Sequence, residues 1–297
     1  MDRVMVVPQL PGAPNASSKM HVSAPVRSCG GQVATTMAAC AAFGLRTAYA
    51  GAIGADDDGR FVRETLLSLS VDLTYLHISP TAVTRSATVL VDAATGERAV
   101  LSNRDGALAM TNHQIDAIDV TAARLIHVDD TDLAASVRLA RAARTAGRMV
   151  TTDIDAAADA EAAIALLTLA THPILSEHAL AVLSGDDDPE RGLRTLRHQC
   201  DGVLSVTLGV RGAMALDGDI LLTAPGISVT AIDTTGAGDV FRAGFIYGLL
   251  AGRSLTETLR FANAAAALSC TRMGAIGGAP SLDEVKELFN MEGHEGP

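Results

Sequence analysis

Lysine is nearly absent from the sequence, which contains only Lys19 and Lys286. Neither lysine follows a G-x-x-x-x-G frame, so a phosphate-binding P-loop is excluded, and so is the lysine-bearing strand of a protein kinase. Aromatic residues are also scarce, at 3%, and tryptophan is missing. Few rings are therefore available to stack on a nucleobase.

The sequence also lacks closely spaced cysteine pairs, long apolar runs and an excess of positive charge. The four cysteines are scattered without a C-x-x-C pair, which fits a reducing compartment. No stretch is long and apolar enough to span a membrane, and no signal pattern opens the chain. The net charge of −11 argues against a nucleic-acid or anionic-membrane surface. We therefore expect a cytoplasmic protein whose partners include neither nucleic acid nor membrane.

The sequence contains a regular alternation of strand-like and helix-like segments, whereas residues 1–28 read as polar and irregular. Such alternation predicts a mainly parallel sheet with helices on both faces and ligands beyond the carboxyl ends of its strands. The expected strands cover 47–53, 125–128, 149–154, 173–175 and 203–208, with hairpins over 86–102 and 213–224. The expected helices cover 31–44, 57–69, 132–146, 159–169, 177–183, 190–199, 239–251, 255–271 and 281–290.

The most informative segment is 233–245, which reads Asp-Thr-Thr-Gly-Ala-Gly-Asp-Val-Phe-Arg-Ala-Gly-Phe. Gly236, Ala237 and Gly238 can turn successive backbone N–H groups toward one point, just before an apolar run that predicts a buried helix. The start of a helix carries unpaired donors and a positive dipole end, so this turn predicts an anion site. Asp239 lies beside it, where a carboxylate suits a general base for a hydroxyl that attacks a phosphoryl group.

This segment resembles the C-terminal signature of the ribokinase-like (PfkB) family of carbohydrate kinases, D-T-x-G-A-G-D, and all its fixed positions are met. The resemblance extends from about Pro8 to Pro280 with the motifs in the correct order. It implies a single kinase domain over 1–297 with an α/β fold, in which a Rossmann-like three-layer α/β/α core holds a mainly parallel central sheet. It also implies a small β-sheet lid, formed by about 1–28 and 84–103.

The N-terminal motifs supply the candidates for substrate binding. Gly30-Gly31 and the glycines of 51–59 resemble the family's G-G-x-x-x-N and G-x-x-G-x-D-x-x-G signatures, but Thr35 stands where the family has Asn. The family also has a substrate-binding Asp just after its first strand. Asp2 matches it loosely, and no counterpart of that strand precedes it, so we expect either a start upstream of Met1 or a shortened chain. The full set of candidates is Asp2, Gly30, Gly31, Gln32, Thr35 and Arg104.

Other motifs imply the nucleotide side of the site, where the resemblance assigns Thr207, Gly209, Gly212, Asn263 and Gly274. Glu177 is the candidate for ordering Mg²⁺. In this region Ser176 and Ala179 replace the Asn and Glu of the family's N-x-x-E motif, and a solvated acid at a helix start is an equally good interpretation of Glu177. Asp233 is the candidate for holding a monovalent cation such as K⁺.

Together these features predict an ATP-dependent kinase of a small sugar or sugar-like substrate, with Mg²⁺ bridging the phosphates and Asp239 as the base. Two alternatives stay open. One is a nucleoside kinase of the same fold, which the shortage of aromatic residues disfavours. The other is a ligand-binding relative without turnover, which Thr35 and Ala179 favour and the intact motif over 233–239 opposes. An open lid edge or lid face could pair two subunits, so we expect a homodimer.

Overall fold

The computed structural model describes residues 1–8, 22, 24–93, 98–103 and 106–292. Its strands are β1 (Asp2–Val7), β2 (Val26–Ser28), β3 (Ala48–Gly54), β4 (Asp72–Ser79), β5 (Ser86–Asp92), β6 (Arg98–Asn103), β7 (Leu125–Asp129), β8 (Met149–Asp153), β9 (Ile174–Ser176), β10 (Leu204–Thr207), β11 (Ala213–Asp217) and β12 (Ile220–Ala224). Its α-helices are α1 (Gln32–Ala42), α2 (Asp57–Ser68), α3 (Asn112–Asp116), α4 (Leu133–Thr145), α5 (Ala160–Leu169), α6 (Glu177–Ser184), α7 (Pro189–Leu196), α8 (Ala237–Leu250), α9 (Leu255–Cys270) and α10 (Leu282–Glu292).

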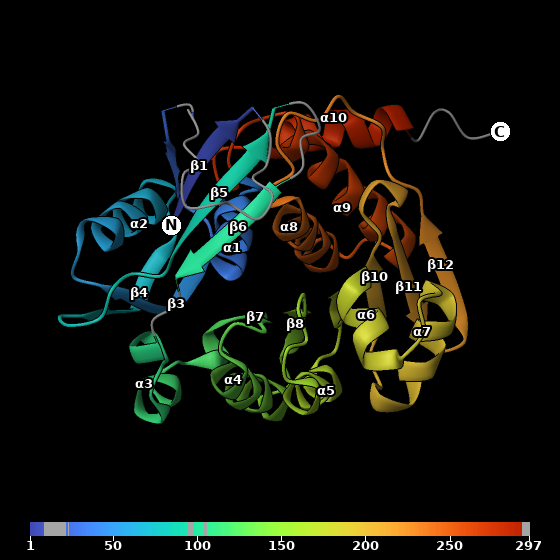
Figure 1. The fold of residues 1–297 in the computed structure, drawn as a ribbon. Coiled ribbons are helices and arrows are strands. Elements are labelled where there is room, and N and C mark those ends of the chain that lie inside the picture. The colour runs from blue at the N-terminus through green and yellow to red at the C-terminus, as the bar shows by residue number, and fades with distance from the viewer. Residues whose placement is uncertain (9–21, 23, 94–97, 104–105, 293–297) are drawn as a thin grey trace.

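The core is an α/β layer arrangement, as the sequence predicts (Figure 1). Strands β3 and β4 pair in parallel, β7 and β8 pair in parallel, and bridges to Leu175 and His172 continue β8 into β9. Strand β9 pairs in parallel with β10, and the expected hairpin of β11 and β12 completes this side in antiparallel order. All the crossover connections between the parallel strands contain a helix, which explains why the strands are covered on both faces.

A second sheet has the order β2-β1-β5-β6 and lies at one side of the core (Figure 1). Strand β1 pairs in parallel with β5 over its whole length and antiparallel with β2. The reading of the first residues as irregular is therefore wrong for Asp2–Val7. Residues 4–7 form a continuous run of four apolar residues after Asp2 and Arg3, so this short segment gave no period-2 signal, and pairing with β5 decides its conformation.

Strand β4 was also missed, because residues 72–79 mix polar and apolar side chains along an exposed edge. Its pairing with β3 shows a register shift between Ala48 and Ala50. The carboxylate of Asp56 joins this region to the second sheet. It caps α2 by accepting from the Gly59 N–H at 2.8 Å and also accepts from the Thr84 N–H at 2.8 Å, two residues before β5.

The helices α8 and α9 pack at very short range. A Cβ placed on Gly244 would lie 2.8 Å from the Cα of Ala262, so only glycine allows this approach. Phe43, Tyr247 and Phe261 continue the contact with rings that meet edge-on or stacked. This rigid pair fixes the start of α8 relative to the sheet.

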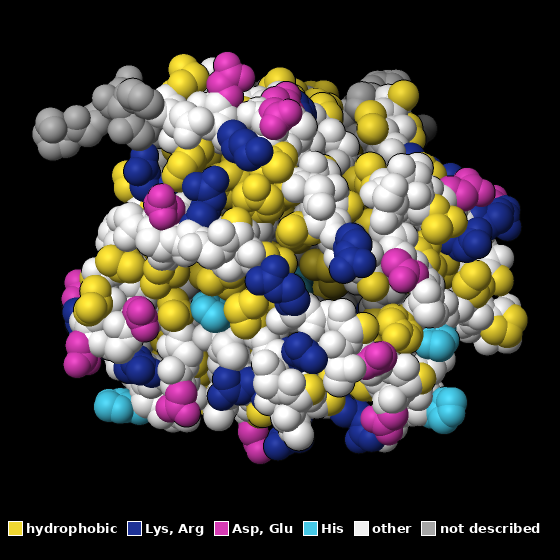
Figure 2. Space-filling view, turned by 180° about the vertical axis from the view of Figure 1, so that it is seen from behind, with side chains coloured by type: hydrophobic (Ala, Val, Ile, Leu, Met, Phe, Trp, Pro, Cys, Tyr) yellow, Lys and Arg dark blue, Asp and Glu magenta, His cyan; other side chains and the backbone are white. Residues whose placement is uncertain are grey.

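The surface charge and the apolar character of the helices concern the expectation that the partners include neither nucleic acid nor membrane. On the face shown in Figure 2, acidic and basic side chains are interspersed, and the basic ones do not form a continuous patch. Within the described part of the chain, no helix combines the length and the apolar character that a bilayer crossing requires.

Candidate active site

The site is built on the start of α8. Gly236 is the N-cap of this helix and has φ +79°, a conformation that favours glycine. A Cβ at this position would lie 2.7 Å from the Cβ of Ala275 and 3.4 Å from the Cγ2 of Thr35. The Ala237 N–H donates to the carbonyl of Thr234 at 3.3 Å, so Gly236 and Gly238 are the residues of this turn whose N–H groups are candidates for binding an anion at the helix start.

Asp239 lies in the first turn of α8, at the edge where β7 and β8 end. Its backbone carbonyl accepts from the hydroxyl of Thr36 at 3.2 Å, which ties the turn to α1. Burial raises the pKa of Asp239 to about 7. The Arg242 guanidinium and a hydrogen bond with the Asp153 carboxyl partly offset this increase. The charges of Asp155 and Asp129 add to it. A carboxyl with that pKa can take up a proton near neutral pH.

A buried ion pair between Arg242 and Asp153 lies next to Asp239. The guanidinium of Arg242 lies 2.5 Å from Oδ1 of Asp153, and the two side chains are only 3% and 2% exposed. A Cβ on Gly238 would lie 2.7 Å from Arg242, so the cation sits directly behind the candidate anion hole. Burial raises the pKa of Asp153 well above its usual range, although Arg242 lowers it, and Asp153 and Asp239 titrate as a pair.

The carboxyl edge of the sheet carries the other acids that the sequence places there. Asp129 and Asp153 are register partners at the ends of β7 and β8. Burial raises the pKa of Asp129. Asp130 instead has a structural role, because its Oδ2 accepts three backbone N–H groups, from Asp155 and the two residues after it, at 2.9–3.1 Å.

The candidate substrate residues gather at the start of α1. A side chain on Gly30 would collide with the carboxylate of Asp2, so the glycine permits this close approach. Burial raises the pKa of Asp2, the positively charged amino terminus partly offsets this, and the charge of Asp233 raises the pKa further. Gly31, with φ +106°, is the N-cap of α1, and the Gln32 amide oxygen accepts from the Thr131 hydroxyl at 2.8 Å.

Two candidates for substrate binding stand apart from this group. Thr35 is fully buried and packs against Gly236, so its position supports the anion turn and does not expose it to a ligand. No hydrogen-bond partner for its hydroxyl occurs among the described residues. Arg104 lies outside the residues that the structure describes.

Asp233 and Gly274 lie together behind the turn. One oxygen of Asp233 accepts from the Thr235 N–H at 2.9 Å and the other from the Gly274 N–H at 2.8 Å. Gly274 has φ +84°. The carboxylate therefore joins the two loops, and each of its oxygens keeps a lone pair for a further contact.

The nucleotide candidates divide into two places. Thr207 and Gly209 line a hollow of about 630 Å³ together with Glu177, which is bonded to Arg211. Gly212, with φ +93°, passes the backbone carbonyl of Ala224 too closely for any side chain.

The side chain of Asn263 donates to the carbonyls of Ala224 and Pro225 at 3.0 and 2.9 Å. Its amide thus holds the loop after β12 in place and is not turned toward a ligand.

The described residues do not form a metal cage. No group of three or more histidine, cysteine or acidic side chains in the described ranges could hold a metal ion. Because Glu177 is engaged by Arg211, its contacts give no support to a role in ordering Mg²⁺. A divalent ion would then be held by phosphate and water, which is a common mode for Mg²⁺.

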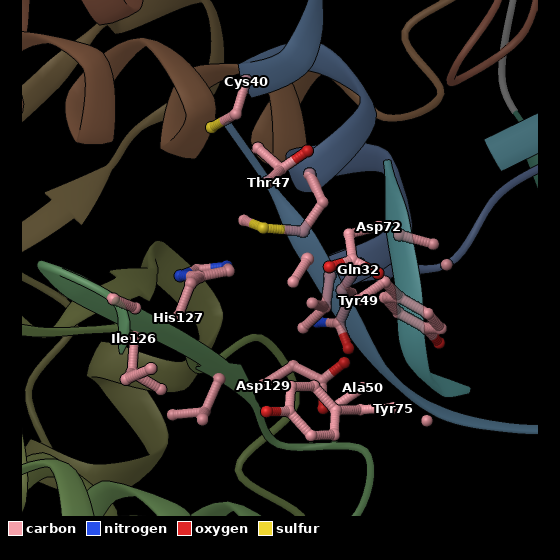
Figure 3. A pocket seen from close by; sticks show the side chains of 18 of the residues that line it. Gln32, Cys40, Thr47, Tyr49, Ala50, Asp72, Tyr75, Ile126, His127 and Asp129 are labelled. Atoms are coloured by element: carbon pink, nitrogen blue, oxygen red, sulfur yellow. The ribbon is translucent and has the colours of Figure 1, made fainter. Parts of the chain in front are cut away.

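A cavity of about 1280 Å³ adjoins the site and extends far beyond it. Figure 3 shows Gln32 and Asp129 at one end and Cys40 and Thr47 at the other, so the cavity follows β3 and β7 from end to end. Only the first of these ends meets the candidate substrate residues.

Sequence reasoning missed Arg242, Thr36 and Thr131 as parts of the site. The signal for Arg242 was present, since a single arginine interrupts the apolar run that predicts a buried helix, and a buried arginine requires a partner. That partner, Asp153, lies 89 positions away in the sequence and is brought near by the fold. Thr36 and Thr131 carry no local signal.

Comparisons with known proteins agree with these features. A family model described as pfkB family carbohydrate kinase matches residues 1–282. The chain is 31% identical to an ATP-dependent ribose-1-phosphate kinase of Halopiger xanaduensis, over 93% of this chain and 92% of that protein. It is 30% identical to a fructokinase of Klebsiella pneumoniae, over 86% and 90%. An Arabidopsis thaliana ribokinase solved with ribose and ATP shares the fold, with a TM-score of 0.82, 23% identity and coverage of 97% and 96%.

Proposed function

The chain belongs to the pfkB family of carbohydrate kinases, and we propose that it transfers the γ-phosphate of ATP to a hydroxyl of a small sugar or sugar-like substrate at the start of α8. It is thus a phosphotransferase with an alcohol group as acceptor. The observation that carries the proposed site is the position of Asp239 in the first turn of α8, beside the N–H groups of Gly236 and Gly238, and burial supports it by raising the pKa of this carboxyl.

In the proposed reaction Asp239 accepts the proton of the substrate hydroxyl. The oxygen forms a bond to the γ-phosphorus while the bond to the bridging oxygen breaks, and ADP leaves. The N–H groups at the start of α8 stabilise the negative charge on the equatorial oxygens, and the nearby Arg242 adds positive potential from behind the turn. Asp2 and Gln32, at the start of α1, are the proposed contacts to the sugar hydroxyls.

The phosphate side is proposed to lie between this turn and the hollow at Thr207 and Gly209. Gly212 and Asn263 shape the loops that border it, through backbone contacts to Ala224. Mg²⁺ is proposed to arrive with ATP, where it would neutralise phosphate charge. Asp233 remains the proposed ligand of a monovalent cation, supported by its buried carboxylate at the base of the turn.

A homodimer is proposed to form through the sheet of β1, β2, β5 and β6. This sheet exposes apolar side chains, with Val26 at 51%, Val100 at 55% and Leu101 at 62%. Val26 and Val100 lie in one register line on the two edge strands, and Leu101 lies on the opposite face, so the support for a partner is the pair of edge strands with exposed apolar residues. Light scattering after gel filtration measures the molar mass of the protein in solution. A monomeric mass at every protein concentration would contradict the homodimer.

The activity is tested by measuring ADP formation from Mg·ATP with a panel of ketoses, aldoses, sugar phosphates and nucleosides. We expect turnover with one sugar class and loss of turnover in Asp239→Asn, because asparagine cannot take up the proton. The control is Asp186→Asn, a half-buried carboxylate paired with the exposed Arg191 on the loop after α6, and it should keep wild-type turnover.

ATP binding by calorimetry separates chemistry from folding in both variants. Retained ATP binding with lost transfer supports Asp239 as the base. Unchanged turnover in Asp239→Asn contradicts that role. Turnover of nucleosides alone would replace the sugar assignment, and ATP binding without turnover of any compound would favour the non-catalytic alternative.

A further inference from the structure

Arg85 places a positive charge at the substrate end of the large cavity. It lines the cavity together with Gln32 and Asp129, which Figure 3 shows at the end that adjoins the candidate site. The hydroxyl of the preceding residue, Thr84, accepts from the N–H of Gly54 at 2.9 Å. Because Gly54 is the last residue of β3, Arg85 follows at the carboxyl edge of the core.

The backbone on both sides of Arg85 is held in place. Asp56 accepts from the N–H and from the hydroxyl of Thr84, at 2.8 and 2.7 Å. Two residues after Arg85, Ala87 pairs with Asp2, a proposed contact to the sugar hydroxyls. The guanidinium is therefore carried by a fixed segment that joins the core to the second sheet, which reduces the entropy that a ligand must offset on binding.

The guanidinium of Arg85 has neighbours in the cavity wall but no ion pair within the described residues. Burial raises the pKa of Asp129 and of Tyr49, and the charge of Arg85 lowers both, so Arg85 lies near these two groups. Its buried Nε has no hydrogen-bond partner in the part of the chain that the structure describes. A buried donor without a partner costs free energy, so this nitrogen is available to an acceptor from a ligand.

Two other arginines whose buried Nε has no described partner have a visible structural role. Arg242 forms a buried ion pair. Arg253 places its guanidinium over the rings of Phe261 and Phe289, 5.1 and 4.9 Å from their centroids. Neither of these arginines lines the cavity. Arg85 differs from both because it lines the space in which a substrate would bind.

The other arginines of the cavity wall lie at its far end. Arg46 and Arg124 also line the cavity, but they precede the first residues of β3 and β7, away from the edge that carries the site. The sequence has only two lysines and a net charge of −11. At the substrate end, Arg85 is therefore the cation that the described wall offers to an anion, where Asp2 and Asp129 would otherwise repel it.

We propose that Arg85 binds an anionic group of the substrate, so that the kinase acts on a sugar phosphate or a sugar acid and not on a neutral sugar. This inference rests on the proposed function and names the substrate class for the same site. A guanidinium presents N–H donors in a planar fork, which matches the oxygens of a phosphate or a carboxylate. The transfer step is unchanged: a substrate hydroxyl gains the γ-phosphoryl group, its proton passes to Asp239, ADP leaves, and the product carries two anionic groups.

Calorimetry in the absence of nucleotide tests the proposal with matched pairs of ligands. Fructose and ribose are each compared with their monophosphate esters at the first and at the last carbon, and sorbitol is compared with gluconate. We expect at least one anionic member to bind about tenfold more tightly than its neutral partner, or better. Binding of an ester indicates a sugar phosphate, whereas binding of gluconate indicates a sugar acid.

Arg85→Gln removes the charge and keeps a polar side chain. It should weaken the binding of the anionic ligand by about 10- to 100-fold and change the binding of the neutral partner by less than about twofold. Arg85→Lys should retain part of the affinity, because it keeps the charge without the planar fork. The matched control is Arg46→Gln, which removes an exposed arginine from the far end of the same cavity and should change neither affinity.

Three results would overturn the proposal. In the first, no anionic member binds more tightly than its neutral partner. In the second, Arg85→Gln weakens the binding of both members equally, which would indicate a structural role. In the third, Arg46→Gln weakens the binding of the anion as much as Arg85→Gln does, which would indicate a general effect of charge.

A failure of this inference is distinguishable from a failure of the proposed function, because binding is measured without ATP. Anion binding that depends on Arg85 but leads to no phosphoryl transfer would contradict the proposed function and support Arg85 as the anion contact. Turnover of a neutral sugar that Arg85→Gln leaves unchanged would do the reverse. Where an anionic substrate is turned over, Arg85→Gln should raise KM with little change in kcat, since the anionic group is bound equally in the ground state and in the transition state.

Discussion

The substitution Arg242→Met tests how the buried ion pair supports the site. It removes a cation that lies 2.5 Å from Asp153, in a pair whose side chains are 3% and 2% exposed. Methionine keeps much of the apolar volume, so the main loss is the charge. An uncompensated Asp153 remains, next to Asp239, and breaking such a pair costs about 3–5 kcal/mol of the free energy of unfolding.

A double-mutant cycle isolates the pair from the general cost of substitution. Because Arg242→Met with Asp153→Asn removes both charges, we expect it to recover most of the stability lost in the single variant. The matched surface cycle uses Arg194→Met and Glu190→Gln, whose ion pair is 46% exposed on each side. That exposed pair should contribute less than about 1 kcal/mol.

Urea unfolding at pH 7 measures the stability of each variant, and the pH profile of kcat/KM measures the effect on the base. Arg242 lowers the pKa of Asp239, so its removal should raise that pKa and move the acidic limb of the profile to higher pH. A loss of stability below about 1 kcal/mol, or additive costs in the double variant, would refute the coupling. An acidic limb that stays in place would refute the link to Asp239.

Three further predictions concern single residues. The pKa of Asp239 is raised from 3.8 to about 7 in the folded chain, so the protonated carboxyl contributes fully to stability below about pH 4, and this contribution is lost as the pH rises through 7. Asp239→Asn should therefore remove at most about 4 kcal/mol from the pH dependence of the free energy of unfolding. Urea unfolding at pH 4 and pH 8 measures this difference. Gly236→Ala adds a Cβ 2.7 Å from that of Ala275 at φ +79°, so it should cost at least about 2 kcal/mol and abolish transfer while Gly252→Ala keeps it. Glu177→Gln should leave the Mg²⁺ concentration for half-maximal activity unchanged, since Arg211 already engages Glu177; a clear increase in a Mg²⁺ titration would restore the metal role.

Local patterns predicted most of the helices and the position of the glycine turn that begins α8. The segment 233–239 is read from sequence because its conformation depends on neighbouring residues: glycine permits φ +79° at Gly236, and the apolar run fixes where α8 begins. The hairpin of β11 and β12 was predictable for the same reason, with Asp217-Gly218 at its turn. Signals of this kind extend over a few residues and survive without knowledge of the partner elements.

Strands whose conformation depends on pairing with distant segments were harder to predict from the sequence. Asp2–Val7 forms a strand because it pairs with β5, about 85 positions later, and β4 depends in the same way on β3. A short strand gains its stability from cross-strand contacts, so its own sequence carries a weak signal. Arg104 lies outside the described residues, and its expected contact with substrate stays a prediction.

The same distinction separates the two halves of the candidate site. The turn that would bind the phosphoryl group is local, whereas the proton affinity of Asp239 depends on Asp153 from β8 and on Arg242 one helical turn further along α8. A buried carboxyl next to a second one would stay protonated near neutral pH, and the nearby Arg242 lowers the pKa of both carboxyls toward a range where one proton can move. The signature over 233–239 ends at Asp239 and includes neither Arg242 nor Asp153, so it places the proposed base without the residues that set its pKa. We therefore expect the Arg242–Asp153 pair to set the pH dependence of activity at this site.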